Sequence, residues 1–457
     1  MQKLLAQPKG FYRNMLTIAL PIALQNLINF SLSLADTMML GMVGQNEIAG
    51  ASVVNSSFFV IMLMVFGFQS GASVLISQYY GKKDMKTVSR VIGLSFFAAF
   101  SIVTVFSVVA MAAPGFLVRI FTNDPIAIEL GKRYMRVVAL AYPINIFTQV
   151  YVGAHRSMGN AKLGLYIYSS AMVVNTFLNW VFIFGHLGAP KMGMEGAAVA
   201  TVLARIVELI ITIFYCRFNK RFHLDLKEAL HPGKQLTADF IRYATPVVLN
   251  ETLWGLGTSL LPAIYGRMGT DILAAVTVSR NIESIANVFS FGVAGAAAVI
   301  IGTQLGEGKS GREEVYHTAK TLLAISAFSG VISCLGLLAA AKFVTPWFSL
   351  PQATKVIGAG IIVFYAMRSI PAQFNTTCVV GVLRGGGDTR VAMLVDISAL
   401  WLANLPVSAL LGLWLKMPIQ VVLLPCVLEE CVKMALGLHR FRSKAWINDI
   451  TREAQEE

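Results

Sequence analysis

Two acidic residues lie inside apolar stretches that are long enough to cross a lipid bilayer. Asp36 is the only carboxylate of the stretch from Pro21 to Gly41, and Glu251 follows Pro246 in a second stretch of this kind. A charged side chain near the bilayer centre costs roughly 2.5–3.5 kcal/mol on insertion scales, so an acid at this depth suggests a function. Protonation or binding of a metal ion relieves that cost. The chemistry indicated is therefore reversible binding of a cation.

The two stretches belong to an internal repeat. Pro21 and Pro246 are 225 residues apart, and Gly-Met-Val-Gly at 41–44 recurs as Gly-Arg-Met-Gly at 266–269 with the same offset. A longer motif, Arg-x-x-Gly-(Asn/Asp)-x-(Lys/Arg), occurs at 156–162 and again at 384–390. Because a unit of six helices has an even number of crossings, both halves share one orientation and are related by an axis along the membrane normal. In transporters of this plan the substrate binds near the midplane, between the lobes.

The composition indicates a polytopic α-helical membrane protein. Of 457 residues, 56% are hydrophobic and only 13% are charged, and the mean hydropathy is +0.66. Soluble domains carry about a quarter of charged residues. We predict an all-α fold with about twelve spans of about 20 residues each. The predicted spans are 14–40, 52–78, 91–112, 134–154, 164–185, 195–216, 240–265, 277–303, 318–340, 357–381, 391–414 and 418–437.

The net charge of +13 is explained by membrane topology rather than by nucleic-acid binding, because no basic stripe is interleaved with exposed aromatic residues. Basic residues mark cytoplasmic loops. They gather after the even-numbered spans and at the C-terminus: Lys82, Lys83, Lys86, Arg90, Arg156, Lys162, Lys309, Arg312, Arg384, Arg390, Arg440, Arg442 and Lys444. We therefore predict a multi-pass protein of a bacterial-type inner membrane with both termini in the cytoplasm.

The repeat and the charges divide the chain into an N-lobe (1–216), a cytoplasmic linker (217–239), a C-lobe (240–437) and a cytoplasmic tail (438–457). In the linker, apolar residues could form a face on the membrane surface, and a flexible loop is the alternative. Its apolar residues are Phe222, Leu224, Leu226 and Leu230. None of the five cysteines has a metal-binding spacing, so we expect them to be packing residues. No cleavable signal peptide is recognised, so the first span is expected to remain.

Short motifs along the whole chain resemble the bacterial-type multidrug and toxic compound extrusion (MATE) transporters. They are Leu20-Pro21, Ala35-Asp36-Thr37-x-Met39-x-Gly41, Gln78-x-x-Gly81, Asn175-Thr-Phe-Leu-Asn179, Gly196-Ala-Ala-Val-Ala-Thr201, Asn250-Glu251-x-Leu253-Trp254-x-Leu256-Gly257, Gln304-Leu305-Gly306 and Leu383-Arg384-Gly385-x-Gly387-Asp388-Thr389. The resemblance implies two six-helix lobes and export of amphipathic organic cations, driven by Na+ or H+ through alternating access. The chain has no G-x-x-x-x-G-K-(S/T) motif, in line with transport without ATP, and we expect no cofactor besides the coupling ion.

The same resemblance implies a coupling-ion site for Na+ made by Asp36, Asn175, Asn179 and Thr201. Asn175 and Asn179 are four residues apart and share one helix face, and oxygen ligands suit a hard cation. Relatives can carry an acid where this chain has Asn179, so the site here keeps one negative charge and suits a monovalent ion. The alternative is a set of interhelical hydrogen bonds, worth about 0.6 kcal/mol each in membranes. Pro21 removes a helix hydrogen bond and is the predicted hinge.

A second site is expected around Glu251, which in similar proteins binds the coupling cation or a cationic substrate. Trp254 follows nearly one turn later and could stack on an organic cation, although core or lipid packing is the alternative. Where some relatives have an acid in the tenth span, this chain has none, and Gln373 takes part in the predicted substrate site instead. Asp396 in the eleventh span either replaces the missing charge or pairs with a basic residue.

Two further acids are interpreted as members of ion pairs within single helices. Glu283 follows Arg280 by three residues, and Glu208 follows Arg205 by the same spacing.

The resulting hypothesis is a secondary-active antiporter that exports organic cations and works as a monomer. A flippase for lipid-linked oligosaccharides or lipids, from the same superfamily, is the alternative; it would favour a large cationic cavity, whereas acids occupy the predicted midplane. An enzyme is not expected, since no His/Glu metal motif or Gly-x-Ser-x-Gly lies in a span. A channel is disfavoured because the repeat lacks a filter-like segment.

Overall fold

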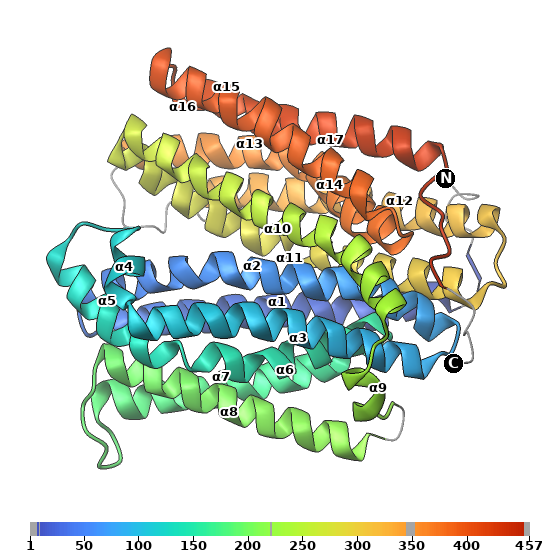
Figure 1. The fold of residues 1–457 in the computed structure, drawn as a ribbon. Helices are drawn as coiled ribbons and strands as arrows, with labels where there is room; N and C mark the ends of the chain where they lie inside the picture. The colour runs from blue at the N-terminus through green and yellow to red at the C-terminus, as the bar shows by residue number, and fades with distance from the viewer. Residues whose placement is uncertain (1–6, 9, 220–221, 344–351, 452–457) are drawn as a thin grey trace. The chain divides into compact units, whose positions relative to one another are not determined.

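The computed structural model describes residues 7–8, 10–219, 222–343 and 352–451. Within these residues the chain is helical and contains no strand, as Figure 1 shows. The helices of the first half are α1 (Phe11–Gly41), α2 (Gln45–Gly81), α3 (Met85–Ala112), α4 (Pro114–Arg119), α5 (Pro125–Val138), α6 (Ala141–Ser157), α7 (Lys162–Phe184), α8 (Met194–Phe218) and α9 (Leu226–Leu230).

The second half contains several π-helical segments. Its helices are α10 (Lys234–Met268), α11 (Thr270–Glu307), α12 (Arg312–Phe343), α13 (Gln352–Thr376), η2 (Thr377–Leu383), α14 (Thr389–Ser398), η3 (Ala399–Asn404), α15 (Leu405–Ala409), η4 (Leu410–Trp414), α16 (Ile419–Val422) and α17 (Leu424–Arg442). α13 continues into η2, and α14 to η4 form one continuous span.

Twelve of these segments correspond to the predicted spans. Nine helices in the described part of the chain are long and apolar enough to cross a membrane by themselves. A tenth span is formed by α5 and α6, which are bent by 52° at their junction. The remaining two, α10 and α17, have lower hydropathy because they carry several charged residues. The predicted all-α membrane fold with about twelve helices is therefore confirmed.

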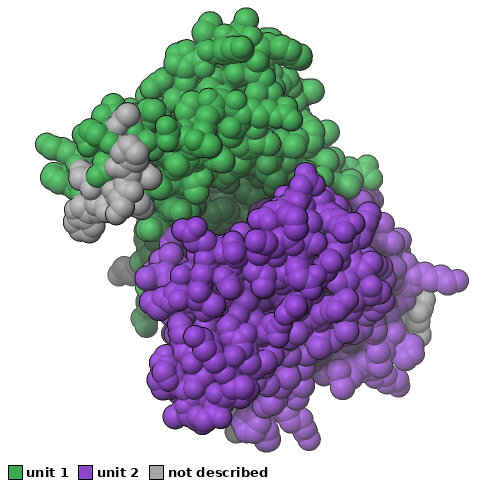
Figure 2. Space-filling view, turned by 90° about the vertical axis from the view of Figure 1, so that its left-hand side faces the viewer, with its two compact units in different colours: residues 1–23, 73–83, 249–457 green, residues 24–72, 84–248 purple. Residues whose placement is uncertain are grey.

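The chain forms two compact units, which Figure 2 shows in different colours. Unit 2 contains residues 24–72 and 84–248, and unit 1 contains residues 1–23, 73–83 and 249–457. The linker thus belongs to unit 2, and the tail belongs to unit 1. Residues 220–221 of the predicted linker and 452–457 of the predicted tail lie outside the described residues. The lobe boundaries at 216 and 240 stay a prediction, because packing and sequence repeat divide the chain at different places.

Two helices pass from one unit to the other directly after a proline. α1 changes unit between Ala23 and Leu24, two residues after Pro21, and α10 changes unit between Val248 and Leu249, two residues after Pro246. Proline lacks the N–H that would close a helical hydrogen bond, so a helix bends most easily there. The hinge role of Pro21 stays a prediction, and Pro246 is the corresponding position in the second repeat.

Glycines allow helix backbones to approach closely within unit 1. A Cβ atom on Gly306 of α11 would overlap the backbone of Gln78 at the end of α2. Small residues at such contacts are how helices pack in lipid, where no hydrophobic force joins them.

We expect Gly306→Ala to destabilise unit 1 by about 1–3 kcal/mol, because the overlap is with backbone atoms that cannot turn away. Thermal unfolding of the purified protein would measure the effect. Gly336→Ala in α12 is the matched control, since no atom lies within 4 Å of its added Cβ. Equal melting temperatures for the two variants would show that the close helix contact does not contribute to stability.

The described part of the linker is packed rather than free. Phe222 is buried and its ring lies 5.8 Å from that of His155. Asp225 caps α9 by accepting hydrogen bonds from the backbone of Lys227 and Glu228. Glu228 in turn pairs with Arg90 of α3 at 2.6 Å. These contacts attach the short helix to α3.

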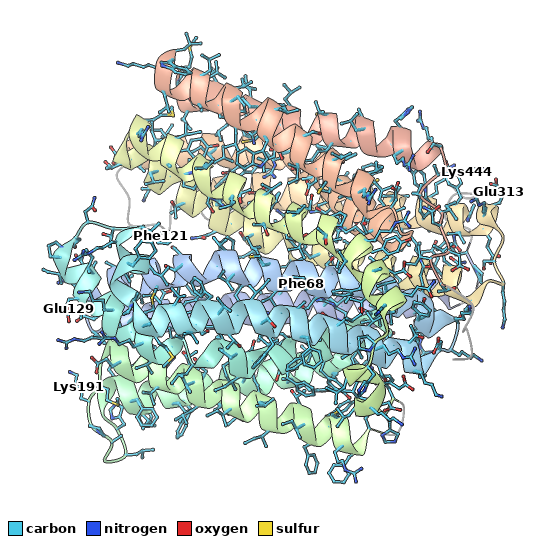
Figure 3. All side chains as sticks on the ribbon, in the orientation of Figure 1. Phe68, Phe121, Glu129, Lys191, Glu313 and Lys444 are labelled. Atoms are coloured by element: carbon cyan, nitrogen blue, oxygen red, sulfur yellow. The ribbon has the colours of Figure 1, made fainter. Side chains whose placement is uncertain are left out.

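The segment after α17 is also buried. Trp446 is 0% exposed, and Ile447 and Ile450 are buried beside it. The Gln78 side chain of α2 donates to the carbonyls of Gly385 and Asn448, both at 3.2 Å, and accepts from the Ile450 N–H at 2.9 Å. Lys444 pairs with Glu313, as Figure 3 shows. The C-terminal segment therefore fastens the end of α2 to the turn between η2 and α14.

Candidate functional site

The predicted coupling-ion residues of unit 2 come together around Asp36. α1 supplies this half-buried carboxylate, and α7 supplies Asn175 and Asn179 from one helix face. The Asn179 amide donates to Asp36 Oδ1 at 2.5 Å and to Asn175 Oδ1 at 3.0 Å. Both asparagines are buried, Asn179 to 1% exposure. The Asn179 amide thus links the Asp36 carboxylate of α1 to the Asn175 side-chain oxygen of α7.

The oxygen atoms of this cluster are suitable ligands for a monovalent cation. Asn179 Oδ1 is buried and has no hydrogen-bond partner among the described residues. A buried acceptor without a partner is costly, so it is a natural ligand for an ion. Together with the Asp36 carboxylate and Asn175 Oδ1 it offers hard oxygen ligands with one negative charge. The Thr201 hydroxyl donates to the Ala197 carbonyl of its own helix at 2.9 Å, and its part in the ion site stays a prediction.

A second polar group in unit 2 surrounds Glu208. Arg205 pairs with it at 2.5 Å, which confirms the predicted ion pair, and Asn145 of α6 donates to its other oxygen at 2.5 Å. Both Glu208 oxygens are therefore satisfied, and the group joins α6 to α8.

In unit 1, Glu251 has a partner that the sequence did not suggest. Arg384 Nη1 lies 2.7 Å from Glu251 Oε1, and Arg384 is only 2% exposed. The expectation that Arg384 belongs to a cytoplasmic loop is wrong, because the helix of the tenth span continues through η2 as far as this residue. Its charge thus compensates a buried acid rather than marking topology.

Asp396 also pairs with a basic residue, as one of the two alternatives predicted. Lys433 Nζ of α17 lies 2.7 Å from Asp396 and 2.6 Å from Glu429. The amide of Asn250 donates to Asp396 at 3.0 Å, and that of Asn404 donates to Glu429 at 2.5 Å. In this cluster two carboxylates share one ammonium group, so Asp396, Glu429 and Lys433 together have one more negative than positive charge.

The predicted partner of Glu283 is wrong. Glu283 pairs with Arg368 of α13 at 2.9 Å rather than with Arg280. Arg368 also binds Glu430 of α17 at 2.8 Å, and Asn375 donates to the same carboxylate at 2.9 Å. Sequence reasoning missed the α17 residues because their spacing resembles that of an ordinary amphipathic helix end.

The remaining two predicted substrate residues lie elsewhere in unit 1. Gln373 is buried, donates to Ser333 and accepts from Ser329 at 2.5 Å, so its side chain joins α13 to α12. Trp254 packs at the edge of the apolar core of unit 1, which includes Leu400. Core packing is the alternative given above for Trp254, and the substrate roles of Trp254 and Gln373 stay predictions.

The fold and the buried ionisable groups define a polytopic helical membrane protein of the secondary-transporter type. The MatE family model matches residues 21–181 and 246–410, two segments that begin at the repeated prolines. The chain therefore belongs to the MatE family, whose members are transporters and not enzymes.

Relatives with curated names cover nearly the whole chain. The "Uncharacterized transporter YisQ" of Bacillus subtilis is 23% identical over 450 residues, covering 97% of each protein. The "Probable multidrug resistance protein NorM" of Thermotoga maritima is 26% identical over 428 residues, covering 89% of this chain and 88% of that protein.

Solved structures share the fold at low identity. A MOP superfamily transporter from Pyrococcus furiosus has a TM-score of 0.84 at 19% identity, covering 97% of both chains. The eukaryotic MATE transporter AtDTX14 has a TM-score of 0.81 at 16% identity, covering 96% of this chain and 97% of that one.

Proposed function

We propose that this protein is an antiporter of the inner membrane that couples inward movement of Na+ or H+ to export of amphipathic organic cations. The cluster of Asp36, Asn175 and Asn179 carries the proposal, because it offers one charge and an unsatisfied amide oxygen in a spanning segment. Relatives named as multidrug resistance proteins support drug-like cargo. The proposed transporter is a monomer with cytoplasmic termini, and it uses no cofactor.

Asn179 gives the coupling ion a way to act on the helices. Its amide N–H donates to Asp36 while its oxygen has no partner among the described residues. A cation or a proton bound to Asp36 competes with the hydrogen bond from the Asn179 N–H. When the Asn179 amide rotates, its oxygen faces the bound metal ion. Ion binding therefore changes the link between α1 and α7, and α1 contains the predicted hinge Pro21. This is a differential interaction of the kind that alternating access requires.

Glu251 is proposed to bind the exported cation in unit 1, with the Trp254 ring one turn away on α10. Asp396 adds negative charge close to it through Asn250. The substrate roles of Gln373 and Thr201's part in the ion site stay predictions.

Ethidium efflux from cells, with Na+ present or replaced by choline, tests this proposal. Export that stops without Na+ would support Na+ coupling, and export that ignores Na+ but stops with a protonophore would support H+ coupling. Cells carrying an empty vector provide the background. If ethidium and other cationic dyes are not exported under any condition, the proposal fails and a lipid or oligosaccharide flippase of the same fold becomes the leading candidate.

A further inference from the structure

We propose that Arg384 is an internal counter-ion which occupies Glu251 when no cargo is bound, and that an exported organic cation displaces it. This inference rests on the proposed function, because it concerns the same carboxylate. It assigns Arg384 a role in specificity: the cargo must compete with a guanidinium group that is part of the protein.

The first observation is the burial of the pair. The two side chains are 2.7 Å apart, with exposures of 2% for Arg384 and 11% for Glu251. Removing one member of a buried ion pair leaves a charge that the low-dielectric surroundings cannot stabilise. Glu251 therefore needs a cation at all stages of transport. Arg384 can fill that place without cargo, and only a positively charged ligand can replace it.

The second observation concerns the helix that carries Arg384. The residue directly follows the π-helical segment η2, and a turn with Gly387 in the left-handed region (φ +82°) comes next. π-helical segments are uncommon, usually short, and frequent at functional sites. The turn itself is held by Gln78 and the C-terminal segment, so the guanidinium group changes direction by rotation of the arginine side chain.

The third observation is an alternative place for the guanidinium group. Asp396 and Glu429 share the single ammonium of Lys433, so this cluster has one more negative than positive charge. Asn250, the neighbour of Glu251 in sequence, donates to Asp396 and so connects the two acidic groups. A guanidinium released from Glu251 remains close to an acidic cluster that has one more negative than positive charge, which lowers the cost of the exchange.

The exchange predicts opposite effects on binding and turnover. In Arg384→Gln the cargo no longer competes with an internal cation, so ethidium should bind about tenfold more tightly. Release should slow for the same reason, and the empty protein should return more slowly because Glu251 has no counter-ion. We therefore expect a lower KM together with a lower kcat, whereas a residue that only supports the fold would lower transport without tightening binding.

Ethidium titration of the purified protein in nanodiscs, followed by fluorescence, measures the affinity. Arg384→Lys retains the charge and should bind ethidium like the wild type. Glu251→Gln/Arg384→Gln removes both charges together, avoids a lone buried ion, and should bind no more tightly than the wild type, because the carboxylate that attracts the cargo is absent. Arg368→Gln removes a guanidinium from a different acidic cluster of unit 1 and is the control, with no gain expected.

Three results would overturn the exchange while leaving the export function intact. They are unchanged affinity in Arg384→Gln, equal gains in Arg384→Gln and Arg368→Gln, or a gain that persists in the double variant. If Arg384→Gln does not fold, a double variant that binds ethidium more tightly than the wild type also refutes the idea. Failure of the wild type to bind or export ethidium would instead refute the proposed function.

Discussion

Asp36→Asn is expected to reduce ion-driven ethidium efflux by about tenfold or more, the size of a lost coupling free energy of 1–3 kcal/mol. Asp36 provides the only negative charge of the cluster with Asn175 and Asn179. The substitution keeps the size of the side chain and leaves three neutral amides, so the site loses its attraction for Na+ and its proton acceptor together. Binding of cargo should persist, because Glu251 belongs to the other unit.

Efflux from cells and binding to purified protein separate these effects. Asp271→Asn makes the same substitution at an exposed position in the first turn of α11 and should leave efflux unchanged. Asp36→Glu, which keeps the charge but moves it, should retain partial activity. Wild-type efflux in Asp36→Asn would mean that the cluster is a structural hydrogen-bond group and that the ion is bound elsewhere.

Lys433→Met is expected to give the largest loss of stability, about 3–5 kcal/mol, because it leaves buried acids without their counter-ion. The Lys433 side chain is 5% exposed and lies within 2.7 Å of both Asp396 and Glu429. Most of the variant should fail to reach the membrane as folded protein. The amount of monodisperse protein after detergent extraction, and its melting temperature, would measure the loss.

A matched substitution distinguishes charge from side-chain volume. Lys320→Met changes the same residue type at an exposed position of α12 and should have little effect. Adding Asp396→Asn and Glu429→Gln to Lys433→Met removes the unpaired charges and should recover much of the folded protein. A Lys433→Met variant as stable as the wild type would show that the carboxylates are protonated or bound to another cation.

The cluster of Asp36, Asn175 and Asn179 was largely predictable because the sequence signals for it are local. Asn175 and Asn179 share a helix face by their spacing alone, and Asp36 stands out as a single acid in an apolar run. Asp36 and Asn179 are joined by a contact between α1 and α7, although they are 143 residues apart in the sequence. Before the structure, only the family resemblance indicated this contact. The twelve spans could also be predicted from the sequence, since each contains a largely apolar stretch of about the length that crosses a membrane.

The charge network of unit 1 was not predictable from spacing. Arg280 is the nearest basic residue to Glu283 in sequence, yet Arg368 on another helix is its partner. Arg384 was misplaced because a glycine-rich motif follows it and suggests a loop, while π-helical geometry carries the helix one turn further. Helix rotation decides which charges meet in the protein interior, and a sequence pattern does not specify rotation between helices that are distant in the chain.

The buried C-terminal segment sets an order of events during synthesis. Gln78 completes its hydrogen bonds only with Asn448 and Ile450, which are made about 370 residues later. At translation rates of about 5–20 residues per second, the end of α2 waits on the order of 20–70 s for these partners. Unit 1 therefore completes these contacts late in synthesis, and a product truncated before residue 443 leaves the Gln78 side chain with only the Gly385 carbonyl of these three partners. Such products expose a polar defect that a quality-control protease can recognise.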